Sequence, residues 1–553
     1  MVKRYALGID YGTESGRALL VDVETGDEVA THVMPYANGV LDETLPDGTK
    51  LDHDTALQDP NDWIAVLKTT VPAVLQEANV SPDQVIGIGV DFTSCTVLPV
   101  DGNGTPLCNL PPYKNRPHAW PKLWKHHAAQ PEADKITQTI HERGDAILER
   151  YGGKMSSEWI VPKIWQVLDE DEEIFDAAAR FIEGGDWIVE QLCGREARSS
   201  CQAGYKGMWD KEEGFPSPEL LKALHPKLEN LVGGKLSPDI KPLGSKAGEL
   251  TGEAAQWTGL KAGTAVAVAI IDAHAAVPGS GVTEPGKMLM VMGTSTCQML
   301  LSEKKASVPG MCGCVRDGIL PGFYGYEAGQ PATGDIFAWF MQACVPQSIQ
   351  DEARQKGLNA HHILEERAAK LQPGESGLIA LDWWNGNRSV LVDAELSGLI
   401  VGLTLTTKPE EIYRTLIEAT AFGARKIIEA FAENGIPINE LYACGGLAEK
   451  NKLMMQIYSD VTGLPIRLAA SPQTCALGAA ILGAVAAGQA NGGYDTPQEA
   501  ARHMARFKDE MYKPAAERHK KYTALYNEYI QLHDYFGRGV NNVMKRLRQM
   551  RLA

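Results

Sequence analysis

The sequence predicts a mixed α/β protein made of two similarly folded halves with a cleft between them. At 553 residues the chain is too long for one ordinary core, so two large domains are expected. A second observation is the internal duplication of one short pattern. Residues 5–22 read YALGIDYGTESGRALLVD, and residues 287–302 read KMLMVMGTSTCQMLLS. Each copy has an apolar strand, a Gly-Thr-x-Ser/Thr turn and a second apolar strand, which is typical of a β-hairpin.

The two turns carry groups that are suited to binding anions. Glycine lets a backbone approach a ligand closely, and the N–H groups and hydroxyls of Gly12-Thr13 and Gly293-Thr294 can form two anion-binding nests. Asp10 precedes the first turn, whereas its counterpart in the second copy is an apolar valine. Since Mg²⁺ needs only one or two carboxylates besides waters and phosphates, this asymmetry predicts a nucleotide between the halves with Mg²⁺ on the Asp10 side. The alternative is that Asp10 merely ends a strand.

The other segments alternate strand-like and helix-like patterns. The runs VIGIGVDF, TAVAVAII and INELYACGG are apolar enough for buried strands. Apolar residues recur at helical spacing from Pro409 to Phe431, and again in ALGAAILGAVAAG from Ala476 to Gly488. Because the latter segment is short and rich in small residues, we expect a close-packed core helix rather than a membrane span.

A turn-rich segment, GSGVTEPG, marks the predicted boundary between the halves near residues 279–286. We therefore expect an N-terminal domain over residues 1–280 and a C-terminal domain over residues 281–553, with a charged helical tail from about residue 496. The tail ends in KRLRQMRLA, which we interpret as a solvated basic helix face.

The composition argues against several classes of function. Apolar content of 44% and charged content of 22% are those of a soluble globular protein. A formal net charge of −17 argues against nucleic acid or an anionic membrane as a partner. No apolar run reaches the length of a membrane span, and the apolar stretch near the start is too short for a signal peptide. The ten cysteines lack disulfide-framework or zinc spacing, so we expect reduced thiols in a cytoplasmic protein, and buried free thiols at Cys312 and Cys314.

A cluster of small polar residues follows the strand-like run VIGIGVDF. Thr93, Ser94 and Cys95 stand where that run ends, and a second apolar run follows and breaks at DGNG. Taken alone, this pattern is typical of a hairpin corner. The alternative is a binding turn, which the other motifs of the chain favour.

Three segments resemble one known family. DYGTESGR and MGTSTC resemble the two phosphate loops of the FGGY carbohydrate kinases, which belong to the actin/Hsp70-like (ribonuclease H-like) superfamily of ATPases. CGGLAEKNKLMMQIYSDV, from Cys444 to Val461, resembles the adenosine motif of this family. The resemblance runs from about residue 5 to residue 490. It implies two actin/Hsp70-like domains that bind ATP and Mg²⁺ in the cleft between them, with the sugar deeper against the N-terminal domain.

Six further segments resemble the members of this family that act on L-ribulose. They are GVDFTSCTVLPVD, LWKHHAA, QAGYKGMW, IDAHAA, YEAGQPATGDIFAWF and LDWWNGNRS. The resemblance implies ATP-dependent phosphorylation of L-ribulose at O5, giving L-ribulose 5-phosphate in the breakdown of L-arabinose, and it is compatible with a homodimer. One alternative is a kinase for another ketose, such as xylulose or rhamnulose. An alternative of another class is an Hsp70- or actin-like ATPase switch, which would not need the polar cluster at residues 93–95.

By the same resemblance, Asp272 is the catalytic base. It ends the apolar run TAVAVAII, and a carboxylate in that place can accept the proton of a sugar hydroxyl. The alternative is that Asp272 only caps a helix. His274 is a secondary candidate for the base.

The resemblance also assigns the binding residues. Lys206 can offer a cation to sugar oxygens or to the transferred phosphoryl group, and Glu327 can accept from two neighbouring hydroxyls, although each residue alone is as typical of a protein surface. The predicted sugar-binding residues are Thr93, Ser94, Cys95, Lys206, Asp272 and Glu327, with tryptophans such as Trp124 as apolar walls. The predicted ATP-binding residues are Gly12, Thr13, Gly293, Thr294, Gly334, Gly445, Gly446 and Asn451, and Asp10 is predicted to hold Mg²⁺ through water.

Overall fold

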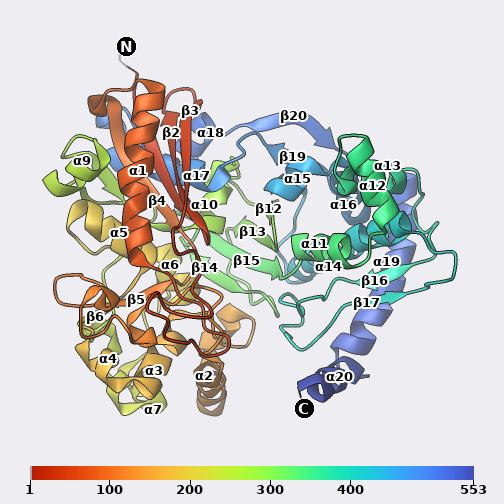
Figure 1. Cartoon of the computed structure of the whole chain (residues 1–553), viewed down its shortest axis with the longest axis horizontal. Helices are drawn as coiled ribbons and strands as arrows, with labels where there is room; N and C mark the ends of the chain where they lie inside the picture. The colour runs from red at the N-terminus through yellow and green to blue at the C-terminus, as the bar shows by residue number, and fades with distance from the viewer. Residues whose placement is uncertain (1–2, 553) are drawn as a thin grey trace. The chain divides into compact units, whose positions relative to one another are not determined.

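The computed structural model describes residues 3–552 and divides the chain into two compact units (Figure 1). Unit 1 contains the chain up to Thr283 together with Gly313–Gly325 and Gln473–Arg506. Unit 2 contains Glu284–Cys312, Tyr326–Pro472 and the chain from Phe507 onward. The units therefore differ from a simple division near residue 280, because two stretches of the second half fold with the first half.

Unit 1 is built around a mixed sheet. Its strands are β1 Tyr5–Tyr11, β2 Ser15–Asp22, β3 Glu28–Pro35, β4 Val85–Phe92, β9 Lys246–Glu249, β10 Ala265–Ala267 and β11 Ile270–Ile271. They lie in the order β3-β2-β1-β4-β10-β9, with β11 also paired to β4. Strands β1, β2 and β3 are antiparallel neighbours, whereas β4 runs parallel to β1, β10 and β11. The carboxyl ends of β1, β4 and β11 therefore meet at one edge of the sheet.

Short ladders and helices complete unit 1. Strand β5 (Val97–Val100) pairs with β6 (Arg180–Glu183), β7 (Arg198–Ser199) pairs with β8 (Ile240–Lys241), and β14 spans Gly313–Arg316. The helices are α1 Pro60–Ala78, α2 Gln130–Arg143, α3 Ile160–Glu170, α4 Glu172–Ala177, α5 Gly184–Cys193, α6 Ser200–Lys206, α7 Pro218–Leu224, α8 Leu231–Gly234, α9 Gly252–Thr258, α10 Asp272–Gly279, α17 Thr474–Ala487 and α18 Pro497–Met504.

Unit 2 is built around a second mixed sheet. Its strands are β12 Lys287–Met292, β13 Thr296–Ser302, β15 Tyr324–Gln330, β18 Glu440–Cys444, β19 Ile466–Ala469 and β20 Phe507–Tyr512, and β16 Ile379–Leu381 pairs with β17 Leu399–Val401 in a separate ladder. The sheet strands of this unit lie in the order β15-β13-β12-β18-β19-β20. The helices are α11 Gly334–Ala343, α12 Gln347–Gln355, α13 Ala360–Ala368, α14 Pro409–Glu433, α15 Gly446–Lys450, α16 Lys452–Thr462, α19 Ala516–Gly537 and α20 Val543–Leu552.

The duplicated pattern forms a hairpin in each unit, as predicted. Strands β1 and β2 are antiparallel around the first Gly-Thr turn, and β12 and β13 are antiparallel around the second. In both sheets the first strand of the hairpin also pairs with a parallel strand, β4 in unit 1 and β18 in unit 2. The predicted strands VIGIGVDF and INELYACGG and the predicted helix from Pro409 are likewise confirmed. The run TAVAVAII instead forms two short strands, β10 and β11.

Helix α17 is the close-packed core helix that the small-residue segment predicts. A Cβ atom on Gly8 or Gly89 would lie 1.8 Å from a carbonyl oxygen of α17, and one on Gly87 would lie 1.9 Å from another. The helix thus lies directly against the backbones of β1 and β4, which is why Gln473–Arg506 belongs to unit 1. On the opposite face, Gly16 packs on Val66 of α1, so the two helices cover the two faces of the sheet.

We expect Gly89→Ala to destabilise unit 1 strongly. Its Cβ would overlap the carbonyl oxygen of Ala479, and such overpacking typically costs about 1–3 kcal/mol or more. For a unit of this size, the midpoint of thermal unfolding should therefore fall by roughly 2 °C or more. Gly102→Ala is the matched control, because no atom would lie within 4 Å of the added carbon. Equal melting temperatures for the two variants, measured by calorimetry, would contradict the close packing of α17 on β4.

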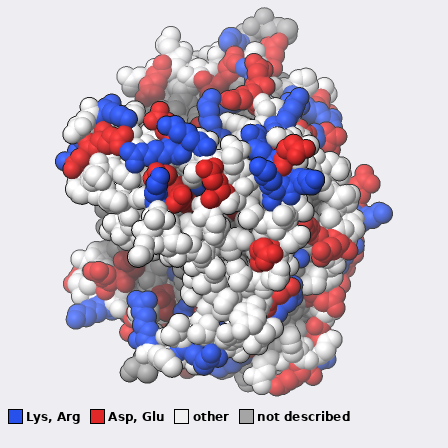
Figure 2. Space-filling view, turned by 90° about the vertical axis from the view of Figure 1, so that its right-hand side faces the viewer, with Lys and Arg blue, Asp and Glu red and all other residues white. Residues whose placement is uncertain are grey.

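The end of the chain is less uniformly helical than the sequence predicts. After α18, strand β20 pairs antiparallel with β19, and only then do α19 and α20 follow. The basic residues of α20 are mostly exposed, and Lys545 pairs with Asp393. On the face shown in Figure 2, Lys and Arg side chains are interspersed with Asp and Glu side chains. Among residues 3–552, no helix combines the length and the apolar character that crossing a membrane requires.

Candidate active site

Three carboxylates meet at the carboxyl ends of the parallel strands in unit 1. The register of β1 and β4 places Asp10 opposite Asp91, and the register of β11 and β4 places Ile270 opposite Asp91. Asp272 follows β11 directly as the first residue of α10. Because strand ends of a parallel arrangement share one edge, Asp10, Asp91 and Asp272 lie close enough to interact electrostatically. The structure therefore brings together the predicted Mg²⁺ ligand and the predicted base.

Asp91 is the carboxylate that the sequence analysis did not single out. It is 0% exposed, and burial, together with the negative charges of Asp10 and Asp272, raises its pKa well above the usual range. Burial also raises the pKa of Asp10, but the Arg17 guanidinium, with Nε 3.4 Å from Asp10 Oδ2, opposes that shift. The pKa of Asp91 is thus displaced upward more strongly than that of Asp10. The signal that could have drawn attention to Asp91 is its place, as a charged residue, inside an otherwise apolar strand.

The first phosphate turn is held by contacts from several parts of unit 1. The Gly12 N–H donates to the Ser15 carbonyl over 3.0 Å, which closes the turn. Gln58 Nε2 donates to the Thr13 carbonyl over 2.8 Å, and Trp124 Nε1 donates to Thr13 Oγ1 over 3.1 Å. Since the Thr13 hydroxyl accepts the indole N–H, its own hydrogen is available for a phosphate oxygen. Trp124 thus contacts the phosphate turn, a role that its predicted place in an apolar wall did not include.

The residues around Asp10 fit an Mg²⁺ ion that is shared with phosphates. Within residues 3–552 there is no cluster of three or more side chains that could hold a metal ion. Mg²⁺, however, usually keeps several waters and takes only one or two carboxylates when substrate phosphates complete its shell. Asp10 is 7% exposed and has the buried Asp91 beside it, so the oxygen donors needed for such a site are present.

The polar cluster at residues 93–95 is not a hairpin corner. Strand β5, which follows the cluster, pairs with β6 and not with β4. The Thr93 N–H donates to the Tyr11 carbonyl over 3.0 Å, so the turn is tied to the end of β1. Cys95 is 1% exposed and has a φ of +46°, a left-handed conformation that is uncommon for a residue other than glycine. Thr93 is also buried, which leaves Ser94 as the most exposed side chain of this turn, named here the sugar turn.

Lys206 is buried near the sugar turn and is not a surface residue. It is the last residue of α6, it is 5% exposed, and its Nζ lies 5.8 Å from the centroid of the Trp159 ring. Burial raises the pKa of the Cys95 thiol, and the positive charge of Lys206 is near enough to oppose that shift. The structure thus brings Lys206 to the sugar turn, whereas the sequence pattern had left a turn lysine at the surface as an alternative.

The surroundings of Asp272 and His274 differ. The cap of α10 is Ile271, so the alternative in which Asp272 serves as that helix cap is wrong. One carboxylate oxygen of Asp272 lies 2.6 Å from the Ala273 nitrogen, and the side chain is only partly buried. His274 is 1% exposed and its ring lies 4.2 Å from the Tyr205 ring between centroids. This packing supports Asp272 over His274 as the group that meets a substrate.

In unit 2 the predicted nucleotide residues gather around the second Gly-Thr turn. The Gly334 N–H, at the start of α11, donates to the Gly293 carbonyl over 3.0 Å, and a Cβ on Gly334 would lie 2.6 Å from that oxygen. Gly445 has a φ of +92°, and a Cβ there would lie 2.5 Å from the Met292 carbonyl oxygen. Gly446 then begins α15. Gly334 and Gly445 therefore pack directly against the turn and the strand before it, where a Cβ would force a shift, whereas a Cβ on Gly446 would meet no atom within 4 Å.

Asn451 has a structural role in unit 2. Its Oδ1 accepts from the Met454 N–H over 2.8 Å and caps α16, and its Nδ2 donates to the Tyr413 hydroxyl over 3.0 Å. Both ends of this side chain are thus engaged within the protein, and its contact with an adenine base stays a prediction.

Glu327 lies in a different unit from the sugar turn. It is on β15, is 7% exposed, and its carbonyl accepts from the Cys312 N–H over 2.8 Å. Cys312 Sγ lies 3.6 Å from Ser389 Oγ, and Cys314 is buried. Because Glu327 belongs to unit 2, its contact with a sugar bound at the sugar turn stays a prediction.

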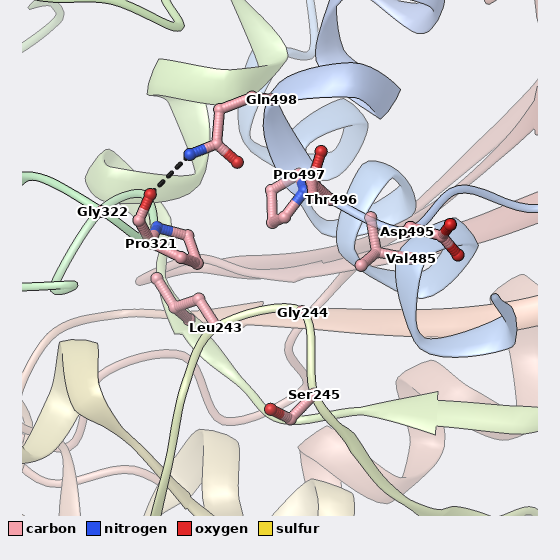
Figure 3. Close-up of a pocket in the computed structure, with 10 residues that line it drawn as sticks. All are labelled: Leu243, Gly244, Ser245, Pro321, Gly322, Val485, Asp495, Thr496, Pro497 and Gln498. Atoms are coloured by element: carbon pink, nitrogen blue, oxygen red, sulfur yellow. Dashed lines mark hydrogen bonds between the residues drawn. The ribbon is translucent and has the colours of Figure 1, made fainter.

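A surface cavity of about 590 Å³ lies elsewhere in unit 1 (Figure 3). Gln498 Nε2 donates across it to the Pro321 carbonyl over 2.5 Å. Its wall is formed by residues 243–245, 321–322, 485 and 495–498, and none of the predicted site residues is among them. The cavity is therefore separate from the carboxylates and turns described above.

A Gly-Thr turn in each unit, together with a carboxylate at a strand end beside a polar turn, is the arrangement that the sequence analysis predicts for an ATP-dependent enzyme that acts on hydroxyls. Residues 5–279 match the N-terminal domain and residues 288–487 the C-terminal domain of the FGGY family of carbohydrate kinases. The chain belongs to this family, and it is a kinase that uses ATP as the phosphate donor. The match favours a kinase over an Hsp70- or actin-like ATPase switch.

Three proteins that are similar over their full length are named ribulokinase. The chain is 59% identical to a ribulokinase of Anoxybacillus flavithermus over 549 residues, which cover 99% of this chain and 97% of that one. It is 58% identical to a ribulokinase of Geobacillus thermodenitrificans, with 99% and 97% covered. It is 48% identical to a ribulokinase of Mycolicibacterium smegmatis, with 99% and 96% covered.

Solved structures show the same fold. A xylulose kinase from Rhodospirillum rubrum matches with a TM-score of 0.78 at 23% identity, covering 96% of this chain and 98% of that one. A glycerol kinase of Plasmodium falciparum with ADP matches with a TM-score of 0.76 at 18% identity, also covering 96% and 98%. At these identities the likeness shows the fold alone, and it confirms the predicted α/β fold of the actin-like, ribonuclease H-like class.

Proposed function

We propose that the protein phosphorylates L-ribulose at O5, with ATP as donor, to give L-ribulose 5-phosphate and ADP. The observation that carries the chemistry is the position of Asp272, at the strand ends beside both the sugar turn and the first phosphate turn. The choice of ketose is supported by full-length likeness to proteins named ribulokinase.

In this proposal Asp272 takes the proton of the O5 hydroxyl as the oxygen attacks the γ-phosphorus of ATP. The hydroxyl is a poor nucleophile, and the rest of the catalysis is positioning and charge stabilisation. Gly12 and Thr13 would hold phosphate oxygens through a backbone N–H and a hydroxyl, and Gly293 and Thr294 would do the same from the second turn. Support for the pairing of the turns is their duplication in sequence and their common hairpin geometry.

Asp10 would hold Mg²⁺ through water. The ion, when bound, would neutralise charge on the ATP phosphates.

The sugar would contact compact groups at the sugar turn and one buried cation. Ser94 presents the most accessible hydroxyl, Thr93 and Cys95 would contribute mainly backbone groups, and Lys206 would offer its ammonium. Glu327 would accept from two sugar hydroxyls. A cytoplasmic location, a homodimer and a role in L-arabinose breakdown are further parts of this proposal that rest on the family resemblance.

A panel of ketoses tested by ADP release would examine the proposed substrate. L-Ribulose should give a kcat/KM at least about tenfold above those of D-xylulose and L-rhamnulose, because a site that pairs with particular hydroxyls rejects misplaced ones. A preference for xylulose or rhamnulose would favour the rival ketose kinases. ADP release that no ketose stimulates would favour an ATPase switch.

A further inference from the structure

Lys163, which the proposed mechanism does not use, is a fully buried lysine in the core of unit 1. It lies on α3 and is 0% exposed, although lysine is rarely buried completely. Its Nζ donates to the carbonyls of Leu123 over 2.7 Å, Cys95 over 2.9 Å and Lys122 over 3.4 Å. An ammonium group has three hydrogens, so these three oxygens satisfy it.

The three carbonyls belong to two segments that are far apart in sequence. Cys95 closes the sugar turn and has the left-handed conformation described above. Lys122 and Leu123 precede Trp124, whose indole N–H donates to the Thr13 hydroxyl in the first phosphate turn. A path of hydrogen bonds and backbone therefore runs from the sugar turn through Lys163 to the phosphate turn.

Other contacts hold the middle of this path in place. Lys122 and Val97 exchange backbone hydrogen bonds of 2.9 and 3.2 Å, and the Gln58 N–H donates to the Pro121 carbonyl over 3.1 Å. Gln58 also donates through its side chain to the Thr13 carbonyl. The segment from Pro121 to Trp124 is thus fixed at both ends, and Lys163 is the side chain that joins it to Cys95.

A lysine suits this place because its single ammonium group can donate to three carbonyl oxygens at once. Burial lowers the pKa of Lys163, and the carbonyl oxygens stabilise its protonated form. Without the ammonium, the carbonyls of Cys95 and Leu123 would lose this donor, and the two segments would be joined only through the backbone pair of Val97 and Lys122. The backbone of Cys95 would then be free to relax from its uncommon conformation.

We infer that Lys163 is a positioning residue of the phosphoryl transfer, which sets the sugar turn at a defined distance from the first phosphate turn. It acts through the backbone of Cys95 and through Trp124, and not by touching a substrate. This inference rests on the proposed function, because it assigns the sugar to the turn at residues 93–95. A misplacement of about 1 Å between reacting groups can cost on the order of a hundredfold in rate.

The test compares Lys163→Met, which keeps an unbranched side chain one atom shorter but removes its donors, with Trp124→Phe, which removes the indole N–H. Lys222→Met, on the exposed face of α7, is the control. For each variant we would measure kcat/KM for L-ribulose, the sugar phosphate formed per ADP released, and the melting temperature. We expect Lys163→Met to lower kcat/KM at least about tenfold and to form less than one sugar phosphate per ADP, because a misplaced hydroxyl lets water compete.

A double variant then separates positioning from simple loss of stability. If Lys163 and Trp124 act along one path, their effects on kcat/KM should be clearly less than multiplicative in the double variant. Multiplicative effects would overturn the inference. So would a Lys163→Met protein with the wild-type kcat/KM that forms one sugar phosphate per ADP released. If Lys163→Met does not fold, a folded Trp124→Phe protein that still forms one sugar phosphate per ADP released would overturn the inference as well. A wild-type enzyme that phosphorylates no ketose would instead show that the proposed function has failed.

Discussion

The Asp272→Asn protein is expected to show a kcat at least about a hundredfold below that of the wild type. Asparagine keeps the size of the side chain and its hydrogen-bonding capacity but cannot take the proton of the sugar hydroxyl. General-base assistance is worth about 10² to 10⁴ in rate, or roughly 3–5 kcal/mol at the transition state. Asp272 is only partly buried at the start of α10, so the substitution should test chemistry more than folding.

Several measurements make this expectation specific. ATP affinity and melting temperature should stay close to those of the wild type, while L-ribulose affinity should fall only modestly if Asp272 also hydrogen-bonds O5. Asp47→Asn, at an exposed turn of the same unit, is the matched control and should retain full activity. A folded Asp272→Asn protein with more than about a tenth of the wild-type kcat would exclude general-base catalysis by this residue, and His274 would be the next candidate.

The second large effect is expected for Asp10→Asn. If Asp10 holds Mg²⁺, the Mg²⁺ concentration for half-maximal rate should rise at least about tenfold, since a neutral amide replaces the anionic donor. Binding of Mn²⁺ with an ATP analogue, followed by electron paramagnetic resonance, should weaken in parallel and needs no turnover. L-Ribulose affinity, measured by calorimetry, should be nearly unchanged.

Asp10 also pairs with Arg17 and lies beside Asp91, so its loss has structural consequences to control for. Arg17→Lys keeps a cation near the carboxylate and should change the Mg²⁺ requirement less than Asp10→Asn does. Equal losses of sugar and metal affinity in Asp10→Asn would contradict the assignment, because they would indicate a general disturbance of the strand ends.

The local elements of the fold were readable from the sequence. The two hairpins follow from apolar runs around Gly-Thr turns, and α14 follows from helical spacing that begins at Pro409. The break between β10 and β11 was not readable, because TAVAVAII is uniformly apolar and periodicity gives no sign of an interruption. The membership of α17 in unit 1 was not readable either. It depends on glycines of β1 and β4, which are hundreds of residues away from α17 in the sequence.

The candidate site was predicted in part. The Gly-Thr turns and Asp10 were found from their own pattern, whereas the base role of Asp272 came only from the family resemblance. The burial of Asp91 could have been read from its place in the apolar run VIGIGVDF. The burial of Lys206 was not predictable, because burial of a charged side chain depends on tertiary neighbours that a single sequence does not show. Lys163 was missed for the same reason: its partners are backbone carbonyls, which leave no trace in the pattern of side chains.

The most direct test of the central claim is the position of the phosphate in the product. Wild-type protein incubated with ATP, Mg²⁺ and L-ribulose should form a sugar phosphate whose ¹³C spectrum shows phosphorus coupling at C5. The Asp272→Asn protein should form the same compound at least about a hundredfold more slowly. Phosphorus coupling at C1, or inorganic phosphate as the only phosphorus product beside ADP, would contradict phosphoryl transfer to the terminal hydroxyl of L-ribulose.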